Sequence, residues 1–283
     1  MVKIYDVLLF LAEILLLILK VVYYICEDIY RFIVPAKEKS VAGEIVLITG
    51  AGHGIGKKLA IGYASLGATV ICWDINEETN NETMNVIKRM GKDVYAYRVP
   101  PQYKLEKYIY IYIIKFVQSA VYKYMKKYYF QMLKAFLPSM IEKNHGHIVA
   151  LSSLAALVSL AHGTVYCPSK CAVQAITATM FEELRILCDR KSSIKFTTIY
   201  PSLVLTGFLK QHNFRHPWLF NRFLILSPQK AATLIINAQR RNYENESLPS
   251  WSLPFVKIMS LLPDKAIKCI LDFAGITVVL PND

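Results

Sequence analysis

Three residues in the second half of the chain could together move a proton between an alcohol and a carbonyl group. Ser153 ends HIVALSS (147–153), a run typical of a buried strand, and Tyr166 and Lys170 follow in YCPSK. Residues four apart on a helix share one face, so these two side chains would be neighbours. A tyrosine pKa of about 10 is too high for a base at neutral pH, but a nearby ammonium group favours the phenolate. We therefore expect Lys170 to lower the pKa of Tyr166, and Ser153 to hold the substrate oxygen.

A second group of residues has the spacing of a turn that binds phosphate. The segment TGAGHGIG (49–56) follows an apolar run typical of a buried strand and precedes a segment with helical periodicity. Gly50 allows a tight turn, Gly54 lets the backbone approach a pyrophosphate, and Gly56 lets the helix pack against the strand, with Ile55 between them. The first N–H groups of that helix would face the phosphates. This pattern predicts a dinucleotide site.

An acidic residue follows at the end of the next predicted strand, ATVICWD (68–74). The Asp74 carboxylate would accept hydrogen bonds from ribose hydroxyls and repel a 2′-phosphate. Lys57 and Lys58 are the nearby cations that could favour NADP. The pattern favours NAD over NADP; the alternative is that Asp74 is a turn residue at the end of a strand.

These elements together predict the fold class, an α/β protein with a Rossmann-type, doubly wound parallel sheet in a single domain. The 283 residues are enough for one such domain and contain no linker-like tract. We expect a hydrophobic membrane-anchor helix in residues 1–35, the Rossmann-fold domain in residues 40–247, and a hydrophobic tail of the same domain in residues 248–283. No His or Cys spacing predicts a metal site.

The amino-terminal segment VLLFLAEILLLILKVVYYI (7–25) has nearly the length of a membrane-spanning helix, interrupted by Glu13 and Lys20. We expect a retained anchor, either spanning the bilayer or lying in one leaflet. The more basic flank that follows favours a main domain facing the cytosol. The alternative is an amphipathic helix that packs on the domain itself.

Composition agrees with membrane contact. The chain is 54% hydrophobic, with a mean hydropathy of +0.32 and a formal net charge of +12. Its basic residues are scattered and form no nucleic-acid-binding motif, so we expect no nucleic-acid partner. Six cysteines without metal-ligand spacing indicate inert thiols in a reducing compartment: Cys26, Cys72, Cys167, Cys171, Cys188 and Cys269.

Taken together, the glycine turn, the serine strand and YCPSK closely resemble the short-chain dehydrogenase/reductase family. YPSLVLTGF (200–208) resembles the next strand and loop of that family, in which Pro201 and Thr206 would border the nicotinamide. The leader, WDIN (73–76) and KAFLPSMIEKNHGHIV (134–149) resemble its membrane- and lipid-droplet-associated branch, which holds epidermal retinol dehydrogenases and 17β-hydroxysteroid dehydrogenases.

This resemblance implies NAD-dependent oxidation of a lipophilic alcohol, retinol-like or steroid. It implies a location at the endoplasmic reticulum membrane or a lipid droplet, and a homodimer formed through helices that include 121–143 and 166–187. The tail, which contains LPSWSLPFVKIMSLL (248–262), would form a wall of the substrate pocket that also touches membrane. The alternative for the tail is ordinary packing on the core.

One region departs from the family pattern. Pro100 stands where the family has an aspartate that meets the adenine, the NNAG motif after the fourth strand is absent, and Met125 stands where a catalytic asparagine is expected. Either YIYIYII (108–114) replaces the fourth strand, or one long helix runs from about residue 104 to 143 and leaves a gap in the sheet. The departures support a second hypothesis, a catalytically impaired or inactive homologue at the membrane or lipid droplet.

Overall fold

A computed structural model describes residues 4–98, 111–114, 121–161, 163–206, 211–213, 215–275 and 277–279. The chain forms two compact units, Met1–Lys39 and Ser40–Asp283. In the first unit, helix α1 (Ile4–Ile33) is apolar along most of its length. Its segment Ile4–Arg31 is long and apolar enough to cross a membrane, with a mean hydropathy of 2.4 and no burial against protein.

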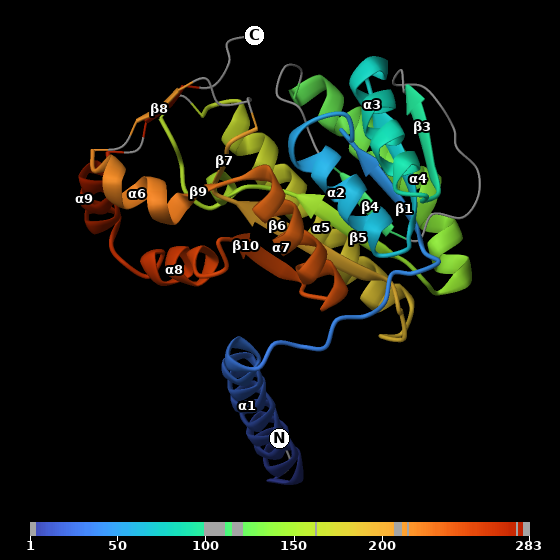
Figure 1. The fold of residues 1–283 in the computed structure, drawn as a ribbon. Coiled ribbons are helices and arrows are strands. Elements are labelled where there is room, and N and C mark those ends of the chain that lie inside the picture. Colours follow the sequence, from blue (N-terminus) through green and yellow to red (C-terminus); the bar gives the residue numbers. More distant parts are fainter. Residues whose placement is uncertain are drawn as a thin grey trace. The chain divides into compact units, whose positions relative to one another are not determined.

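The second unit is built on a seven-stranded sheet with the order β10-β6-β5-β4-β1-β2-β3 (Figure 1). Every pairing in this sheet is parallel. The strands are β1 (Ile45–Thr49), β2 (Thr69–Asp74), β3 (Val94–Arg98), β4 (Ile111–Ile114), β5 (His147–Leu151), β6 (Lys195–Pro201) and β10 (Asn245–Leu248). Parallel strands place all their carboxyl ends at one edge, which is where ligands bind in such sheets. The predicted Rossmann-type fold class is confirmed.

The strand β4 occupies the centre of the sheet. Ile113 is in register with Ile48 of β1 on one side and with Val149 of β5 on the other. The run of Tyr and Ile therefore replaces the fourth strand, and the alternative of a gap in the sheet is wrong. Helix α4 begins at Val121, and Met125 lies within it. Pro100 lies outside the described residues.

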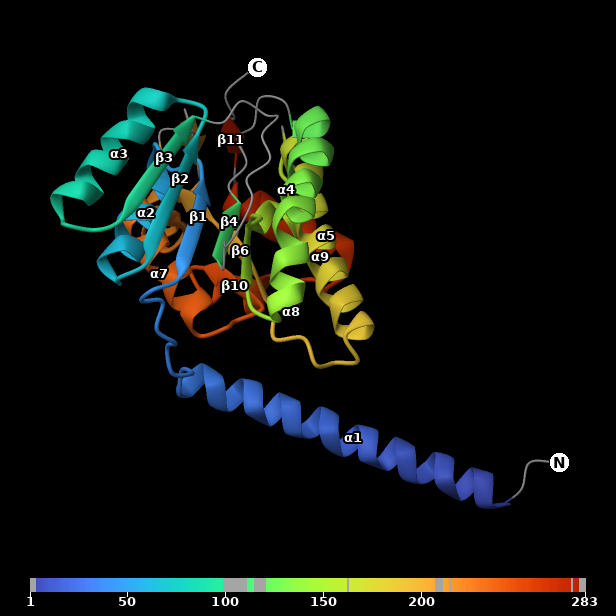
Figure 2. The same cartoon turned by 90° about the vertical axis from the view of Figure 1, so that its right-hand side faces the viewer.

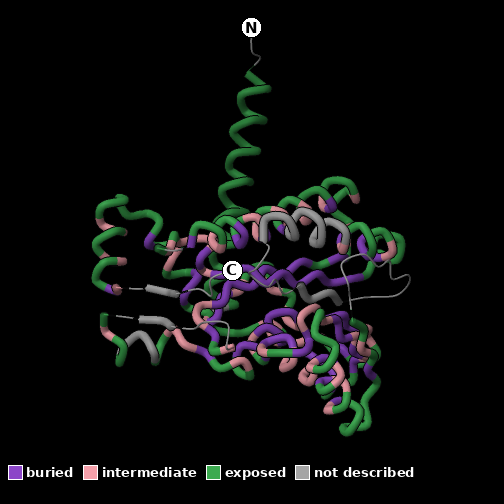
Figure 3. The backbone as a smooth tube through the Cα atoms, turned by 90° about the horizontal axis from the view of Figure 1, so that it is seen from above, coloured by how far each residue is buried: buried purple, intermediate pink, exposed green. Residues whose placement is uncertain are grey.

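Helices cover both faces of the sheet. Figure 2 shows α2 (Gly54–Ser65), α3 (Glu77–Arg89) and α7 (Pro228–Arg240) on one face, and α4 (Val121–Lys143) and α5 (Tyr166–Leu187) on the other. The alternation of side chains along β1 explains the two cores, since Val46 and Ile48 pack under α2 and α7 whereas Leu47 packs under α4. Strands β1, β5 and β6 are accordingly largely buried, and the outer helical faces are exposed (Figure 3).

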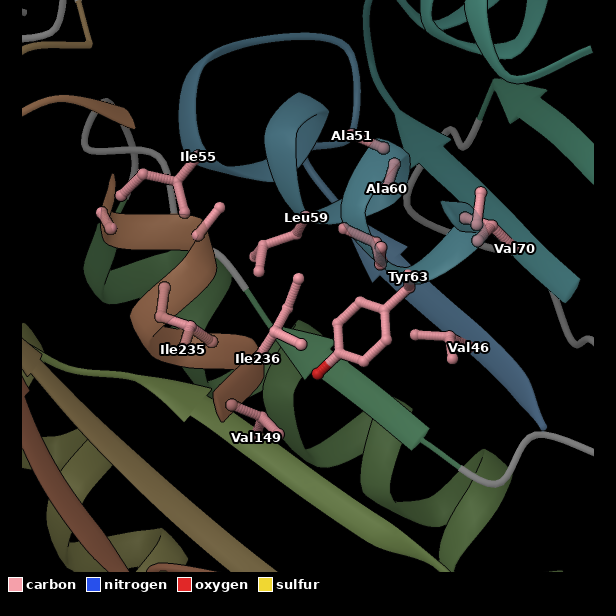
Figure 4. Packing of buried hydrophobic residues seen from close by; sticks show 14 of the residues in the cluster. Val46, Ala51, Ile55, Leu59, Ala60, Tyr63, Val70, Val149, Ile235 and Ile236 are labelled. Atoms are coloured by element: carbon pink, nitrogen blue, oxygen red, sulfur yellow. The ribbon is translucent and has the colours of Figure 1, made fainter. Parts of the chain in front are cut away.

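The larger core also contains polar groups that bond to one another. Tyr63 points into the cluster beside Val46 (Figure 4), and its hydroxyl donates to Gln239 Oε1 at 3.3 Å. Gln239 Nε2 lies 3.3 Å from His147 Nδ1, and His147 Nε2 lies 2.8 Å from Thr197 Oγ1. These contacts join α2 and α7 to the amino-terminal end of β5 and to β6, and thus hold the helices on this face against the sheet.

The remaining elements lie beyond the carboxyl edge and around β10. They are the 3₁₀ helix η2 (Leu154–Ala156), strands β7 (Leu203–Val204), β8 (Gln211–Asn213), β9 (Ile225–Leu226) and β11 (Thr277–Val279), and helices α6 (Pro217–Leu224), α8 (Ser252–Met259) and α9 (Asp264–Ala274). Strand β7 pairs with β9, and β8 pairs with β11. The tail from residue 248 thus consists mainly of the end of β10, two helices and β11.

Candidate active site

The turn after β1 depends on glycine at specific positions. Gly50 and Gly54 have positive φ angles of 68° and 58°, which side-chain-bearing residues adopt at a cost. A Cβ atom on Gly56 would lie 1.9 Å from the Gly50 carbonyl oxygen, and one on Gly52 would lie 2.4 Å from Thr79 Oγ1. The close approach of helix to strand that the sequence predicts at Gly56 is therefore present.

The amino terminus of α2 opens directly from this turn. His53 occupies the N-cap position, and its side chain does not cap the helix. The first N–H groups of α2 are thus not satisfied by a side-chain cap, and they carry the positive end of the helix dipole. Ile55 is buried in the first turn and fixes the helix against the core. This arrangement suits the phosphates of a dinucleotide.

Asp74 ends β2 beside the glycine turn. Its Oδ2 atom accepts a hydrogen bond from the Gly52 amide at 2.8 Å, and its Oδ1 atom accepts one from the Asn76 amide at 2.9 Å. Each carboxylate oxygen has a further lone pair that could accept from a ribose hydroxyl. Burial, together with the Asp74 charge, raises the pKa of Cys72 to about 12, so this cysteine stays a neutral thiol.

Asn76, the N-cap residue of α3, and Asn80 and Thr83 within this helix order α3, the neighbouring strands and the turn, and the sequence analysis did not identify them. Asn76 caps the helix by accepting from the Thr79 amide at 3.2 Å. Asn80 Nδ2 donates to the Cys72 and Tyr97 carbonyls at 3.1 and 3.2 Å, and Thr83 Oγ1 donates to the Ala51 carbonyl at 3.0 Å. The available signal was the spacing of Asn80 and Thr83, i and i+3, which places these two side chains on one face of α3, and both are buried.

Ser153 stands just beyond the carboxyl end of β5. Its Oγ atom accepts from the Ala155 amide at 3.2 Å, which starts η2, and lies 3.4 Å from the Pro201 carbonyl at the end of β6. The preceding Ser152 donates through Oγ to the Lys170 carbonyl at 2.9 Å. The serine pair thus joins the ends of two strands to the first turns of α5.

Tyr166 and Lys170 occupy the first two turns of α5. Lys170 Nζ lies over the Tyr166 ring, 5.6 Å from its centroid, and donates to the Leu151 carbonyl at 3.0 Å. Lys170 is buried and Tyr166 half-buried, and a side-chain hydrogen bond joins Tyr166 to Ser153. The structure therefore brings Ser153, Tyr166 and Lys170 together at the carboxyl edge.

The pKa of Tyr166 differs from the sequence-based expectation in direction. Burial raises this pKa, the hydrogen bond with Ser153 acts against that increase, and the nearby Cys167 adds to it. The ammonium group of Lys170 is directed to the Leu151 carbonyl, and its proximity does not outweigh the loss of hydration around the phenol. The phenol is thus the favoured form at neutral pH in the protein by itself.

The predicted site residues form two groups along the carboxyl edge. The glycine turn and Asp74 lie at the ends of β1 and β2, whereas Ser153, Tyr166 and Lys170 lie at the end of β5. Strand β4 lies between β1 and β5. Thr206 follows β7, and its amide donates to the Val204 carbonyl at 2.8 Å; the contacts described for it do not reach either group.

The sequence matches the family model for short chain dehydrogenase over residues 44–102 and 118–216. The chain belongs to the short-chain dehydrogenase family. The match omits residues 103–117, which lie within the region that departs from the family pattern, whereas Pro100 and Met125 lie in matched segments. Family membership and dehydrogenase relatives make the chain an oxidoreductase.

Several relatives match over nearly the whole chain. Short-chain dehydrogenase/reductase family 16C member 6 of Bos taurus is 32% identical and covers 93% of this chain and 90% of its own length. Epidermal retinol dehydrogenase 2 of Mus musculus is 32% identical, with 96% and 93% covered, and 17-beta-hydroxysteroid dehydrogenase 13 of Homo sapiens is 31% identical, with 90% and 91% covered.

Solved structures confirm the short-chain dehydrogenase fold. A short chain dehydrogenase/reductase from Burkholderia phymatum in complex with NAD superimposes with a TM-score of 0.65 at 22% identity, covering 77% of this chain and 93% of that one. A 7 alpha-hydroxysteroid dehydrogenase complexed with NADH gives a TM-score of 0.57 at 22% identity, with 75% and 90% covered. Within the described residues, no group of three or more His, Cys, Asp or Glu could hold a metal ion.

Proposed function

We propose that the chain is a membrane-anchored, NAD-dependent dehydrogenase that interconverts a lipophilic alcohol and its carbonyl compound. The observation that carries this proposal is the grouping of Ser153, Tyr166 and Lys170 at the carboxyl end of β5. In the same sheet, a glycine turn and a terminal carboxylate at β1 and β2 suit a dinucleotide. In this proposal the residues at the end of β5 transfer the proton, and the residues at the ends of β1 and β2 bind the cofactor.

In this proposal the Tyr166 oxygen exchanges a proton with the substrate oxygen. Ser153, which is hydrogen-bonded to Tyr166, orients that oxygen and shares the proton. Lys170 stabilises the phenolate as it forms and holds the nicotinamide ribose. Bound NAD would supply the hydride acceptor for the alcohol carbon.

The cofactor assignment favours NAD over NADP. Asp74 presents a carboxylate beside the Gly52 amide, where a 2′-phosphate would meet negative charge. Gly50, Gly54, Ile55 and Gly56 would hold the pyrophosphate at the start of α2. Pro201 and Thr206 would border the nicotinamide.

The substrate class follows from the relatives and from the apolar character of the chain. Two relatives are named as acting on retinol and on 17-beta-hydroxysteroids, and such lipophilic alcohols partition into membranes. Helix α1 in residues 1–35 would anchor the enzyme, and we place the domain on the cytosolic side of the endoplasmic reticulum or on a lipid droplet. Helices α4 and α5 would form a homodimer.

A second candidate function is binding of the dinucleotide without turnover. The observation that favours it is the absence of the NNAG motif and of the helix asparagine, whose position Met125 occupies. The family model also omits residues 103–117, which include β4, the strand that the NNAG motif would follow; Met125 lies in the matched segment 118–216. In that case the protein would act at the membrane as an inactive homologue.

The test is formation of NADH by the full chain in detergent micelles, with all-trans-retinol and estradiol as substrates. We expect absorbance from NADH to rise with at least one of them, and Tyr166→Phe to lower the rate by about 10²–10⁴-fold. Tyr95→Phe, which changes an exposed tyrosine on β3, is the matched control and should keep the wild-type rate. Turnover that survives in Tyr166→Phe would remove the assignment, whereas binding of NADH without turnover would favour the second candidate.

A further inference from the structure

Two cysteines lie four residues apart at the start of α5, next to the residues proposed for proton transfer. Cys167 directly follows Tyr166, and Cys171 directly follows Lys170. Residues at i and i+4 are neighbours on the surface of a helix, with Cβ atoms about 5–6 Å apart. No other two of the six cysteines have this spacing. We call Cys167 and Cys171 the α5 thiol pair.

Both thiols of the pair contact the segment that connects β5 to α5. Cys171 Sγ donates to the Ala156 carbonyl of η2 at 3.1 Å. A Cβ atom on Gly163 would lie 2.6 Å from Cys167 Sγ, so this sulfur packs against the same connecting segment. Cys171 is exposed, Cys167 is partly exposed, and both are free thiols. A reagent in solvent can therefore reach the pair.

The separation of the pair suits a bridge of one atom better than a direct disulfide. A disulfide needs Cβ atoms about 3.5–4.5 Å apart, which is less than the helical spacing provides. Its formation would therefore distort the first turns of α5. An atom that bonds to both sulfurs spans the wider separation without this distortion.

The ligand set limits the kind of centre that could bridge the pair. Thiolates are soft ligands and prefer soft, thiol-seeking centres. In the part of the chain that the structure describes, no cluster of three His, Cys, Asp or Glu side chains could complete a metal site, whereas a structural zinc ion takes four ligands. A trivalent arsenical with one carbon substituent has two bonds left for sulfur, which is the number that the pair offers. Because the second bond forms within one molecule, the pair should hold such a centre against single thiols.

Occupation of the pair would disturb the serine of the candidate active site. The Cys171 thiol loses its proton when the sulfur bonds to arsenic, so it can no longer donate to the Ala156 carbonyl. Ala156 is the last residue of η2, and the side chain of Ser153 caps this short helix by accepting from the Ala155 amide. A shift of η2 would therefore move the Ser153 hydroxyl relative to Tyr166, to which it is hydrogen-bonded.

We propose that the α5 thiol pair is a covalent binding site for trivalent arsenicals with one carbon substituent, and that occupation of this site inhibits the enzyme. In the reaction, the arsenic of an arsenoxide forms two bonds to sulfur, and its oxygen leaves as water with both thiol protons. Arsenic stays trivalent, so no oxidant or reductant is required. The binding is independent of the proposed function, whereas the inhibition rests on it.

The test is mass spectrometry of the intact full chain in detergent micelles, after treatment with phenylarsine oxide and removal of weakly held reagent with mercaptoethanol. We expect the wild type to gain one phenylarsenic unit less two hydrogen atoms, and Cys167→Ser and Cys171→Ser each to gain none. Cys269→Ser is the matched control, because it removes an exposed cysteine of α9 and should bind as the wild type does. Binding that persists in both pair variants, or its absence in the wild type, would overturn the proposal.

A second measurement uses the wild type alone and does not depend on the folding of a variant. After treatment with the arsenical, N-ethylmaleimide should label Cys269 but neither Cys167 nor Cys171, as read from peptide maps. Dithiothreitol, once it has been added and removed, should restore the labelling of both cysteines. Equal labelling of the pair with and without the arsenical would contradict the site.

Formation of NADH by the same samples tests the inhibition separately. Bound arsenical should lower the wild-type rate at least about tenfold, since a displacement of about 1 Å among positioned groups can lower a rate by about 100-fold. Dithiothreitol should restore the rate. Bound arsenical with an unchanged rate would overturn the link to Ser153. A chain that binds the arsenical but forms no NADH before treatment would contradict the proposed function and support the site.

Discussion

The nucleotide side of the sheet, β1 to β3, and its centre, β4, are ordered by different means. On the nucleotide side, side chains of α3 and β2 bond to the backbone of the turn and of neighbouring strands, through Asp74, Asn80 and Thr83. At the centre, β4 is held in register with β1 and β5 by its backbone. The family model matches the nucleotide side and omits residues 103–117, in which β4 lies.

This difference separates what the fold requires from what the chemistry requires. A parallel sheet needs a strand between β1 and β5 because both would otherwise leave buried N–H and C=O groups unpaired. Alternating Tyr and Ile satisfy that need because these residue types suit a strand. The position of Ser153, Tyr166 and Lys170 thus survives the replacement, whereas the NNAG motif that would follow the strand does not.

The largest effect on stability is expected from a substitution that interrupts β4 at the centre of the sheet. Ile113→Pro removes an N–H group from a strand with neighbours on both sides. We expect the free energy of unfolding to fall by at least about 3 kcal/mol, since several buried backbone groups lose partners at about 1–3 kcal/mol each. Ile113→Val keeps the backbone N–H group and a β-branched side chain, so it should cost much less than Ile113→Pro. Equal urea midpoints for the proline variant and wild type would show that β4 is not part of the sheet.

On the nucleotide side of the sheet, one added methyl group at Gly56 should lower both the stability and the cofactor binding of the protein. Gly56→Ala places a Cβ atom against the Gly50 carbonyl oxygen. We therefore expect the free energy of unfolding to fall by about 1–3 kcal/mol, and NADH binding to be lost because the turn can no longer close. Gly62→Ala is the control in the same helix, because the atom nearest to its added Cβ would be Cδ1, the end of the Ile236 side chain, and not a backbone atom. Its stability should stay within about 1 kcal/mol of wild type. Calorimetry measures the stability of the two variants, and NADH fluorescence measures their cofactor binding. Normal NADH affinity in Gly56→Ala would contradict the role of the tight turn.

The catalytic group can be tested through pH. Burial raises the pKa of Tyr166, so the phenolate is the minor form near neutrality and its fraction increases about tenfold for each unit of pH. We therefore expect kcat/KM for alcohol oxidation to increase as pH rises from neutrality. Lys170→Met should move this increase to still higher pH, since it removes a cation beside the phenolate. Lys195→Met, which changes an exposed lysine, should leave the profile unchanged; a flat wild-type profile would contradict the role of Tyr166.

The smallest effect concerns the choice of cofactor. Asp74→Asn keeps an oxygen that can accept from the Gly52 amide but removes the charge. We expect the NADH affinity to fall about tenfold, which is about 1.4 kcal/mol of binding free energy. The ratio of NADH affinity to NADPH affinity should become smaller. Isothermal titration of both cofactors measures this change. If the NADPH affinity were unaltered and the NADH affinity undiminished, Asp74 would be only a turn residue.

Much of the fold and the main site follow from local sequence patterns. The glycine spacing and YCPSK predict the turn and the helical neighbours because both depend on residues close in the chain. The direction of the Tyr166 pKa could not be predicted, because burial depends on the packing of distant segments. The hydrogen bonds of Asn80 and Thr83 to the backbone of β2 and of the glycine turn were not predicted for the same reason, since these partners lie on other elements. The replacement of the fourth strand was one of two alternatives, and pairing with β1 and β5 decides it.

The most direct measurement is a titration of the purified full chain with NADH and with NADPH, followed by fluorescence. If the glycine turn and Asp74 bind the cofactor despite the replaced centre of the sheet, NADH should bind saturably and more tightly than NADPH, and Gly56→Ala should abolish the signal. Failure of the wild-type chain to bind either dinucleotide would contradict the proposal that this edge of the sheet is a cofactor site.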